Sequence, residues 1–266
     1  MLALVAFVRG ARTPPRGAAE ARADQPVRCS ARTIDGARYR VCEIPAAAVP
    51  RLRLVARDAR GRPLRTMARV DTMLRARGER LLFATNAGIY EAADSATGML
   101  VADGGRVYSR LNQQPGPPDP CATANFYCPP NGVFFVAGGF GGVLPTSYLA
   151  ARAASAPAVE LASQSGPMLL RSGRLARPFD PASQSRTVRN GVGIRSDGTI
   201  VFAISDDRVT FHQLATAFGA LACREALYLD GTISRLYAGP GERIPRQSHD
   251  FAAMFIVTEP IATGRR

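Results

Sequence analysis

Apolar runs separated by short turns dominate the chain from Val27 onward. Apolar residues that alternate with polar ones predict half-buried strands, and short continuous apolar runs predict buried strands. Such strands or hairpins are predicted in segments 39–44, 50–58, 80–88, 97–111, 131–139 and 159–175. The apolar spacing predicts a helix only over 67–77 and, in a shorter form, over 145–154. The chain before residue 190 is therefore rich in strands.

The segment 191–230 combines three clear signals. GVGIRSDGTIVFAIS predicts a hairpin with a two-residue Asp197-Gly198 turn. Thr210 and Gln213 match a capping box, and apolar residues then recur at helical spacing. Those residues are Phe211, Leu214, Ala215, Phe218, Leu221 and Ala222. The apolar strand ALYLD follows and stops at Asp230. Hairpin, helix and strand in this order predict an α+β fold with an extensive mixed β-sheet and few helices.

The two ends of the chain fall outside this pattern. Residues 27–260 contain no linker and are expected to form a single domain, with residues 261–266 as a tail. Residues 1–26 contain a short apolar stretch, LALVAFV, followed by an Arg-, Pro- and Ala-rich segment. Two interpretations remain open, a degraded or mis-started export signal and a disordered tail. No apolar run reaches the length of a transmembrane helix.

The net charge of +13 first suggests nucleic-acid binding. Residues 1–80 contain 18 Arg against 7 acidic residues, whereas residues 81–266 contain 16 Arg against 14. The chain has no Lys, and aromatic residues are not interleaved with the Arg residues. A nucleic-acid surface normally mixes Lys with Arg and adds aromatic side chains for stacking. The prediction is therefore that nucleic acid is not a partner.

The cysteine positions indicate disulfides and not a metal site. Cys29 and Cys42 flank a predicted turn at Asp35-Gly36, so a hairpin would bring their sulfur atoms together. Cys121 and Cys128 could close a second loop, which leaves Cys223 as a buried thiol. The cysteines match no zinc spacing, and we predict neither a metal nor a cofactor. Structural disulfides imply an oxidising compartment, so a periplasmic or secreted location is expected.

Common catalytic motifs such as G-x-S-x-G, HExxH and the P-loop are absent. What remains is a set of polar residues where apolar strands end, often beside a Gly that permits close approach of a ligand. The set comprises Asn86, Gly88, Asn131, Ser165, Arg189, Asn190, Asp206, Asp230, Gly231 and Ser234. Each residue alone is also typical of an ordinary turn. Arg189 is more informative, because a basic group beside an apolar strand usually has an acidic or phosphate partner. His212 and His249 have no such context. We expect His212 to be structural, in the first turn of the predicted helix, and His249 to lie on a solvated loop.

Four motifs occur together in an order that resembles the phosphodiester glycosidase family. They are NAGIY, GPMLLRSGRL, RNGVGIRSDGTIVFAIS and LATAFGALACREALYLDGTIS. The family includes the mannose 6-phosphate uncovering enzyme, and the motifs NGVF and LYLDG-x-x-S are similar to its bacterial branch. The resemblance covers roughly residues 30–258. It departs from the uncovering enzyme at Thr232-Ile233, where that enzyme has two glycines, so the resemblance leaves the identity of the substrate open.

The resemblance implies hydrolysis of a sugar-1-phosphodiester on a phosphorylated sugar or glycan, with release of the sugar and a phosphomonoester. A phosphomonoester is a good leaving group because its second pKa is about 6. The expected catalytic residues are Asp230 as nucleophile or base, Asp206 as second carboxylate and Arg189 as phosphate ligand. The others bind substrate: Asn86, Gly88, Asn131, Ser165, Asn190, Gly231 and Ser234. The alternative is an envelope protein that binds phosphorylated glycans without cutting them.

Overall fold

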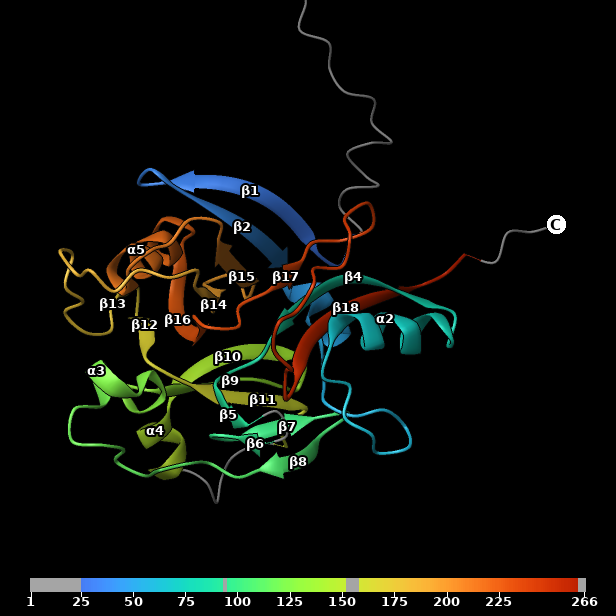
Figure 1. The fold of residues 1–266 in the computed structure, drawn as a ribbon, viewed down its shortest axis with the longest axis horizontal. Helices are drawn as coiled ribbons and strands as arrows, with labels where there is room; N and C mark the ends of the chain where they lie inside the picture. The colour runs from blue at the N-terminus through green and yellow to red at the C-terminus, as the bar shows by residue number, and fades with distance from the viewer. Residues whose placement is uncertain (1–24, 93–94, 152–157, 263–266) are drawn as a thin grey trace, which may run out of the picture.

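Three antiparallel β-sheets surround one central apolar core in the computed structural model, which describes residues 25–92, 95–151 and 158–262 (Figure 1). The seven-stranded sheet runs in the order β1 (Arg28–Ile34), β2 (Ala37–Ile44), β15 (Ile200–Ser205), β14 (Asn190–Arg195), β16 (Cys223–Asp230), β12 (Met168–Arg171) and β13 (Arg174–Leu175). The five-stranded sheet contains β10 (Phe140–Pro145), β9 (Gly132–Ala137), β11 (Leu161–Ser165), β7 (Leu100–Ala102) and β8 (Arg106–Ser109). The four-stranded sheet contains β17 (Leu236–Tyr237), β4 (Glu79–Asn86), β18 (Met254–Pro260) and β3 (Arg53–Val55). A short pair, β5 (Tyr90–Ala92) and β6 (Ser95–Ala96), completes the strands of the described residues.

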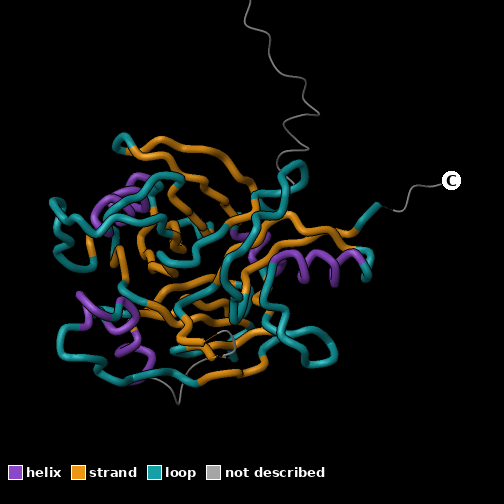
Figure 2. The backbone as a smooth tube through the Cα atoms, viewed as in Figure 1, coloured by secondary structure: helices purple, strands orange, loops and turns teal. Residues whose placement is uncertain are grey.

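Helices are short and lie outside the core, as the tube in Figure 2 shows. The α-helices of the described residues are α2 (Met67–Arg75), α3 (Pro120–Thr123), α4 (Thr146–Ala151) and α5 (Phe211–Ala220). Two 3₁₀ turns, η1 (Ala46–Arg51) and η2 (Asn125–Tyr127), add to them. Helix α5 packs on the seven-stranded sheet and α2 on the four-stranded sheet, where each forms an apolar cluster of its own. None of the described helices is long and apolar enough to cross a bilayer.

The α+β class, the extensive sheet and the small share of helix are confirmed. The sheets differ from the expectation in one respect, because the paired strands of the described residues are antiparallel throughout. The capping box at the start of α5 is also confirmed: Thr210 Oγ1 accepts from Gln213 N and Gln213 Oε1 accepts from Thr210 N. The proposed export signal in residues 1–26 falls almost wholly outside the described residues.

Two local predictions were wrong in detail. The segment 50–58 was expected to be a strand from its start, but Pro45 and Pro50 frame the 3₁₀ turn η1 and only Arg53–Val55 joins a sheet. Proline lacks a backbone N–H and so cannot donate to a strand partner. The hairpin of β14 and β15 has a longer turn than two residues, closed by Arg195 N donating to Thr199 O at 3.0 Å. Gly198 takes φ +82°, which suits the glycine position of a three-residue hairpin loop.

The described residues contain two disulfides: Cys29–Cys42, which was predicted, and Cys121–Cys128, a pairing that the sequence left open. Cys29 and Cys42 face each other across β1 and β2, and Asp35-Gly36 forms the turn between these strands. Cys121 and Cys128 close the loop around α3. Cys223 is a buried free thiol, and burial raises its pKa to about 12. A thiol of this kind is unreactive at neutral pH.

Polar residues lie close together where the central strands of the seven-stranded sheet begin or end. Strand β14 begins at Asn190, β15 ends at Ser205 and β16 ends at Asp230, and Asn190 pairs with both Ile204 and Asp230. Strand β4 of the neighbouring sheet ends at Asn86 and reaches the same region. Antiparallel pairing therefore brings residues that are far apart in the sequence to one place.

Candidate functional site

A buried hydrogen-bonded group joins the ends of β4, β14 and β16. Asn190 Nδ2 donates to Asn86 Oδ1 at 2.9 Å and to Thr85 Oγ1 at 3.1 Å. Ser234 Oγ lies 3.2 Å from Asn190 Oδ1 and 2.9 Å from the carbonyl oxygen of Asp230. We call Asn86, Asn190 and Ser234 the amide cluster. Its three side chains are at most 2% exposed, so the cluster is rigid and its hydrogen bonds are shielded from water.

The orientation of the Asn86 amide is fixed by its partners. Asn86 Oδ1 accepts from Asn190 Nδ2 and also from Arg235 N at 3.1 Å. Since only an oxygen can accept both bonds, the amide nitrogen must point the other way. Asn86 Nδ2 is buried and has no hydrogen-bond acceptor among the described residues. A buried donor without an acceptor costs about 1–3 kcal/mol, which an incoming acceptor would remove.

Asp230 ends β16 with a buried carboxyl group. Its Oδ1 accepts from Thr232 N at 2.6 Å and Ile233 N at 2.7 Å, so the following turn holds the side chain in place. Asp230 is 7% exposed and takes part in none of the ion pairs of the described residues. Burial raises the pKa of Asp230, and the backbone N–H groups of residues 231–233 offset only part of that effect. A raised pKa makes a carboxyl group a better proton acceptor than an exposed aspartate.

Arg189 lies directly before Asn190 and is almost completely internal. Four of its five N–H groups are engaged: Nε donates to Val209 O at 3.0 Å, one Nη1 hydrogen to Tyr228 Oη at 3.3 Å, and Nη2 to Ser185 O and Oγ at 3.1 and 3.2 Å. The guanidinium carbon lies 3.8 Å from the centre of the Phe211 ring. Arg189 is 2% exposed, and burial lowers its pKa while the nearby Tyr228 and Asp230 oppose that shift. The second N–H of Nη1 has no acceptor among the residues that the structure describes.

Tyr228 connects Arg189 with the end of β16. Tyr228 lies two residues before Asp230 on β16, and the pairing of β16 with β14 shifts in register between these two residues. A Cβ atom built on Gly231 would collide with Tyr228 Oη and approach Thr187 Cγ2 to 2.9 Å. Glycine at 231 therefore lets the tyrosine hydroxyl lie against the backbone beside Asp230. Burial raises the pKa of Tyr228, so the hydroxyl stays protonated.

Three other candidates lie behind this arrangement. Ser165 Oγ donates to the carbonyl oxygen of Leu229, the residue before Asp230, at 3.2 Å. Asn131 Nδ2 donates to Phe126 O at 3.1 Å, and a Cβ on Gly166 would come within 2.7 Å of Asn131 Cβ. Gly88 packs on β11, where a Cβ would meet Ser163 Oγ at 2.7 Å. These residues support the backbone around the site.

Asp206 is not part of the hydrogen-bonded cluster. It follows β15 at the same edge of the sheet, but its side chain is 41% exposed and lies 3.7 Å from Arg40 Nε. Arg40 in turn pairs with Glu242 at 2.8 Å. Asp206 therefore belongs to an ion-pair network at the rim, whereas Asp230 and the amide cluster are buried.

Comparison with known proteins shows which family the chain belongs to. A family model described as phosphodiester glycosidase matches residues 79–262, which include all ten candidate residues. The chain belongs to the phosphodiester glycosidase family. The YigE protein of Escherichia coli (strain K12) is 34% identical over 175 residues, which cover 65% of this chain and 64% of that protein. The chain thus aligns with less than two thirds of that relative.

The phosphodiester glycosidase fold is also seen in a solved structure. The catalytic domain of zebrafish N-acetylglucosamine-1-phosphodiester alpha-N-acetylglucosaminidase, auto-inhibited by its pro-peptide, superposes with a TM-score of 0.53 and 14% sequence identity. The match covers 87% of this chain and 81% of that one. At this identity the likeness shows a shared fold.

Several residues of the candidate site were not found from the sequence. Tyr228 was missed because the register shift between β16 and β14 falls between Tyr228 and Asp230, and strand periodicity does not show such a shift. Ser185, Val209 and Phe211 surround Arg189 from a loop and from α5, and no local pattern indicates that. Among the described residues no group of three His, Cys, Asp or Glu side chains is placed to hold a metal ion.

Proposed function

We propose that this protein hydrolyses a sugar-1-phosphodiester, releasing the sugar and a phosphomonoester. The observation that carries the proposal is Asp230, a buried carboxyl group with a raised pKa, fixed between the amide cluster and the Arg189–Tyr228 pair. Membership of the phosphodiester glycosidase family supports the reaction class. The two halves of such a substrate, a sugar and a phosphate, need two different kinds of binding group, and both kinds flank Asp230.

Asp230 is proposed to act on the sugar carbon or on the attacking water. Its Oδ1 is held by two backbone N–H groups, so Oδ2 is the oxygen left for chemistry. A phosphomonoester leaves without strong acid assistance because its second pKa is about 6. One well-placed carboxyl group is then sufficient for a reaction that in most glycosidases uses two.

The phosphate is proposed to bind beside Gly231. Arg189 has one free Nη1 hydrogen, and Tyr228 Oη already accepts from that guanidinium, so its own hydrogen can be donated outward. A charged donor behind the tyrosine strengthens the bond that the tyrosine gives. Burial keeps both groups in a low-dielectric environment, where an anion is held more strongly than in water.

The sugar is proposed to bind on the side of the amide cluster. Asn86 Nδ2 is a fixed, buried donor whose missing acceptor would be supplied by a sugar hydroxyl. Asn190 and Ser234 hold Asn86 in that orientation, and Gly88, Asn131 and Ser165 hold the surrounding backbone. Asp206, at the exposed rim with Arg40, is proposed to contribute only a weak electrostatic effect.

An extracytoplasmic location is proposed as well, with an envelope or extracellular glycoconjugate as substrate. The support is the pair of disulfides, since structural disulfides persist in oxidising compartments.

The test is steady-state turnover of a phosphodiester that joins the anomeric carbon of a sugar to an alkyl or aryl phosphate. Wild-type protein should turn over, and Asp230→Asn should lose more than tenfold in kcat, a barrier change above about 1.4 kcal/mol, with little change in KM. Asp206→Asn is the matched control and should keep most of its activity. Saturable binding without turnover by the wild type would favour the non-catalytic glycan-binding protein instead.

A further inference from the structure

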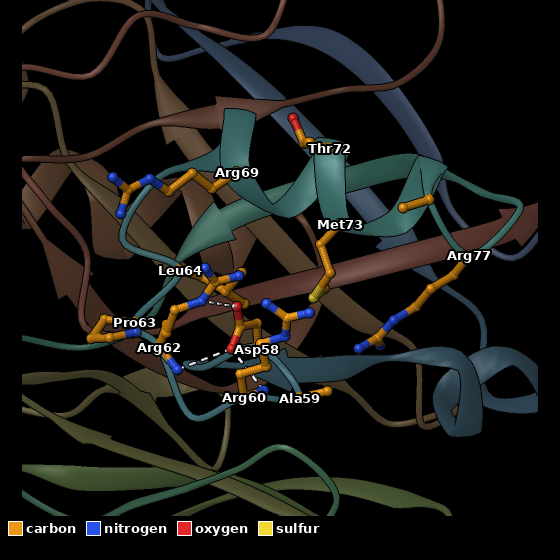
Figure 3. A pocket seen from close by; sticks show the side chains of 11 residues that line it. Asp58, Ala59, Arg60, Arg62, Pro63, Leu64, Arg69, Thr72, Met73 and Arg77 are labelled. Atoms are coloured by element: carbon orange, nitrogen blue, oxygen red, sulfur yellow. Dashed lines mark hydrogen bonds and ion pairs between the residues drawn. The ribbon is translucent and has the colours of Figure 1, made fainter.

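A hollow lined mainly by basic residues lies between α2 and the loop that precedes it. The segment 51–77 contains nine Arg and only two acidic residues, and it precedes the region that matches the family model. The loop 58–64 and one face of α2 enclose a hollow of about 810 Å³, shown in Figure 3. We call this hollow the arginine groove. Its lining contains four Arg residues, Arg60, Arg62, Arg69 and Arg77, and one acid, Asp58. None of the candidate site residues lines it.

The groove is preformed because Asp58 organises its loop. Asp58 Oδ1 accepts from Arg60 N and Arg62 N, each at 2.9 Å, and Asp58 Oδ2 accepts from Arg62 Nε at 2.8 Å. These bonds, the one from the Arg62 backbone first, lower the pKa of Asp58. The only acid of the groove is thus fully engaged with its own loop and with Arg62. A preformed wall reduces the ordering cost when a ligand binds.

Three guanidinium groups of the groove have no ion-pair partner among the described residues. They belong to Arg60, Arg69 and Arg77, all of which are exposed. Arg69, Thr72, Met73, Ala76 and Arg77 recur at helical spacing, so they form one stripe along α2 and the turn after it. In Figure 3 Met73 points from α2 toward the loop, while Arg69 and Arg77 diverge to opposite sides. Because these two side chains diverge, each would contact a different phosphate.

The chemistry of the lining selects among polyanionic ligands. No aromatic side chain lines the groove, so the base stacking that retains single-stranded nucleic acid is missing. The exposed large apolar side chains of the described residues, Val107, Phe140, Tyr148, Leu175 and Ile261, all lie elsewhere, so nothing here would insert into a membrane. A concave hollow of this volume can surround individual phosphate groups of a ligand, which a flat surface cannot do.

We propose that the arginine groove binds a glycan chain bearing at least two phosphodiester groups. Guanidinium groups match phosphate oxygens in geometry and charge, which accounts for the phosphate part of the assignment. The glycan part rests on the proposed function, because a polymer of sugar phosphates would offer one phosphodiester to Asp230 and further ones to the groove. The groove is a binding site and takes no part in bond cleavage.

The test uses the whole chain with both disulfides formed and a fluorescein-labelled oligomer of sugar units long enough to span the groove. Its phosphodiester links avoid the anomeric carbon, so the proposed catalytic site cannot cleave it. Fluorescence anisotropy at roughly 0.15 M salt gives the affinity. The triple variant R60Q/R69Q/R77Q should bind about tenfold more weakly and show a shallower salt dependence, because it lacks three phosphate contacts. The control R171Q/R174Q/R224Q removes the same charge from exposed residues of β12, β13 and the start of β16 and should bind almost as wild type does.

The proposal is overturned if both triple variants weaken equally, or if the wild type binds the oligomer no better than inorganic phosphate. Tighter binding of an oligothymidylate of equal charge, or of phosphatidylglycerol vesicles, would also overturn it in favour of nucleic acid or membrane. If the triple variant has a lowered Tm, the single variants R69Q and R77Q replace it, and each should also bind the oligomer more weakly than the wild type. Turnover of a small sugar phosphodiester should be unchanged in every groove variant, so loss of polymer binding and failure of the proposed catalytic function are distinguishable.

Discussion

Arg189→Lys tests whether the buried guanidinium holds the site together. The guanidinium serves three separate acceptors, Val209 O, Tyr228 Oη and Ser185, and stacks on Phe211. A single ammonium group can reach one of these acceptors. Two buried bonds from a charged donor are then lost at about 1.5 kcal/mol each, and the ring contact at about 1 kcal/mol. The expected loss of stability is about 4 kcal/mol, or roughly 10 °C in Tm for a chain of this size.

Thermal unfolding by circular dichroism, with the disulfides intact, measures this loss. Arg186→Lys is the matched control, because the exposed Arg186 makes one side-chain contact, with Gln213 Oε1, and should change stability by less than about 0.5 kcal/mol. The kcat/KM of Arg189→Lys should fall with its stability, since Tyr228 loses its fixed donor. If Arg189→Lys has the same Tm as Arg186→Lys, the hydrogen bonds of the buried guanidinium do not stabilise the fold and the reasoning about Arg189 is refuted.

Three further predictions concern stability. Burial raises the pKa of Asp230 above its ordinary 3.8, so the folded protein binds the carboxyl proton more tightly than the unfolded chain does. The stability that this proton contributes is complete below pH 3.8 and is lost as the pH rises through the pKa of the folded state. Asp230→Asn should therefore melt above the wild type at neutral pH, with the gap closing in acid; a gap independent of pH would contradict this. Gly231→Ala should lose about 1–3 kcal/mol and most activity through collision with Tyr228, whereas Gly219→Ala, in an open helical position, should gain about 0.5–1 kcal/mol in chemical denaturation. Replacing Cys29 and Cys42 by Ser should cost about 3 kcal/mol for a separation of 13 residues, and an unchanged melting curve would show that this disulfide does not stabilise the fold.

The parts of the fold and the site that could be predicted depend on local signals. The Cys29–Cys42 bond follows from two cysteines at equal distance from an Asp-Gly turn, and α5 follows from its capping box and apolar spacing. Asn190 and Asp230 are neighbours because both stand at strand ends, and antiparallel pairing brings such ends to one edge.

The remainder depends on contacts between distant segments. Asp206 stands at a strand end just as Asp230 does, yet it faces Arg40 of β2 and solvent, and only the neighbouring strand decides that. Carbonyl groups, a tyrosine and a phenylalanine surround Arg189, and they come from segments that no local sequence pattern brings together. The arginine groove depends on the packing of α2 against a loop that Asp58 holds, and composition alone showed only an excess of charge.

The most direct test of the central claim is hydrolysis of a sugar-1-phosphodiester in water enriched in ¹⁸O. A glycosidase cleaves the bond between the sugar carbon and oxygen, so water attacks the carbon and the phosphate keeps its own oxygens. The account predicts that the wild type turns over the substrate and that Asp230→Asn does not. It also predicts that mass spectrometry finds no ¹⁸O in the phosphomonoester released. Incorporation of ¹⁸O into the phosphate would mean cleavage at phosphorus, and that result, or turnover equal in wild type and Asp230→Asn, would contradict the account.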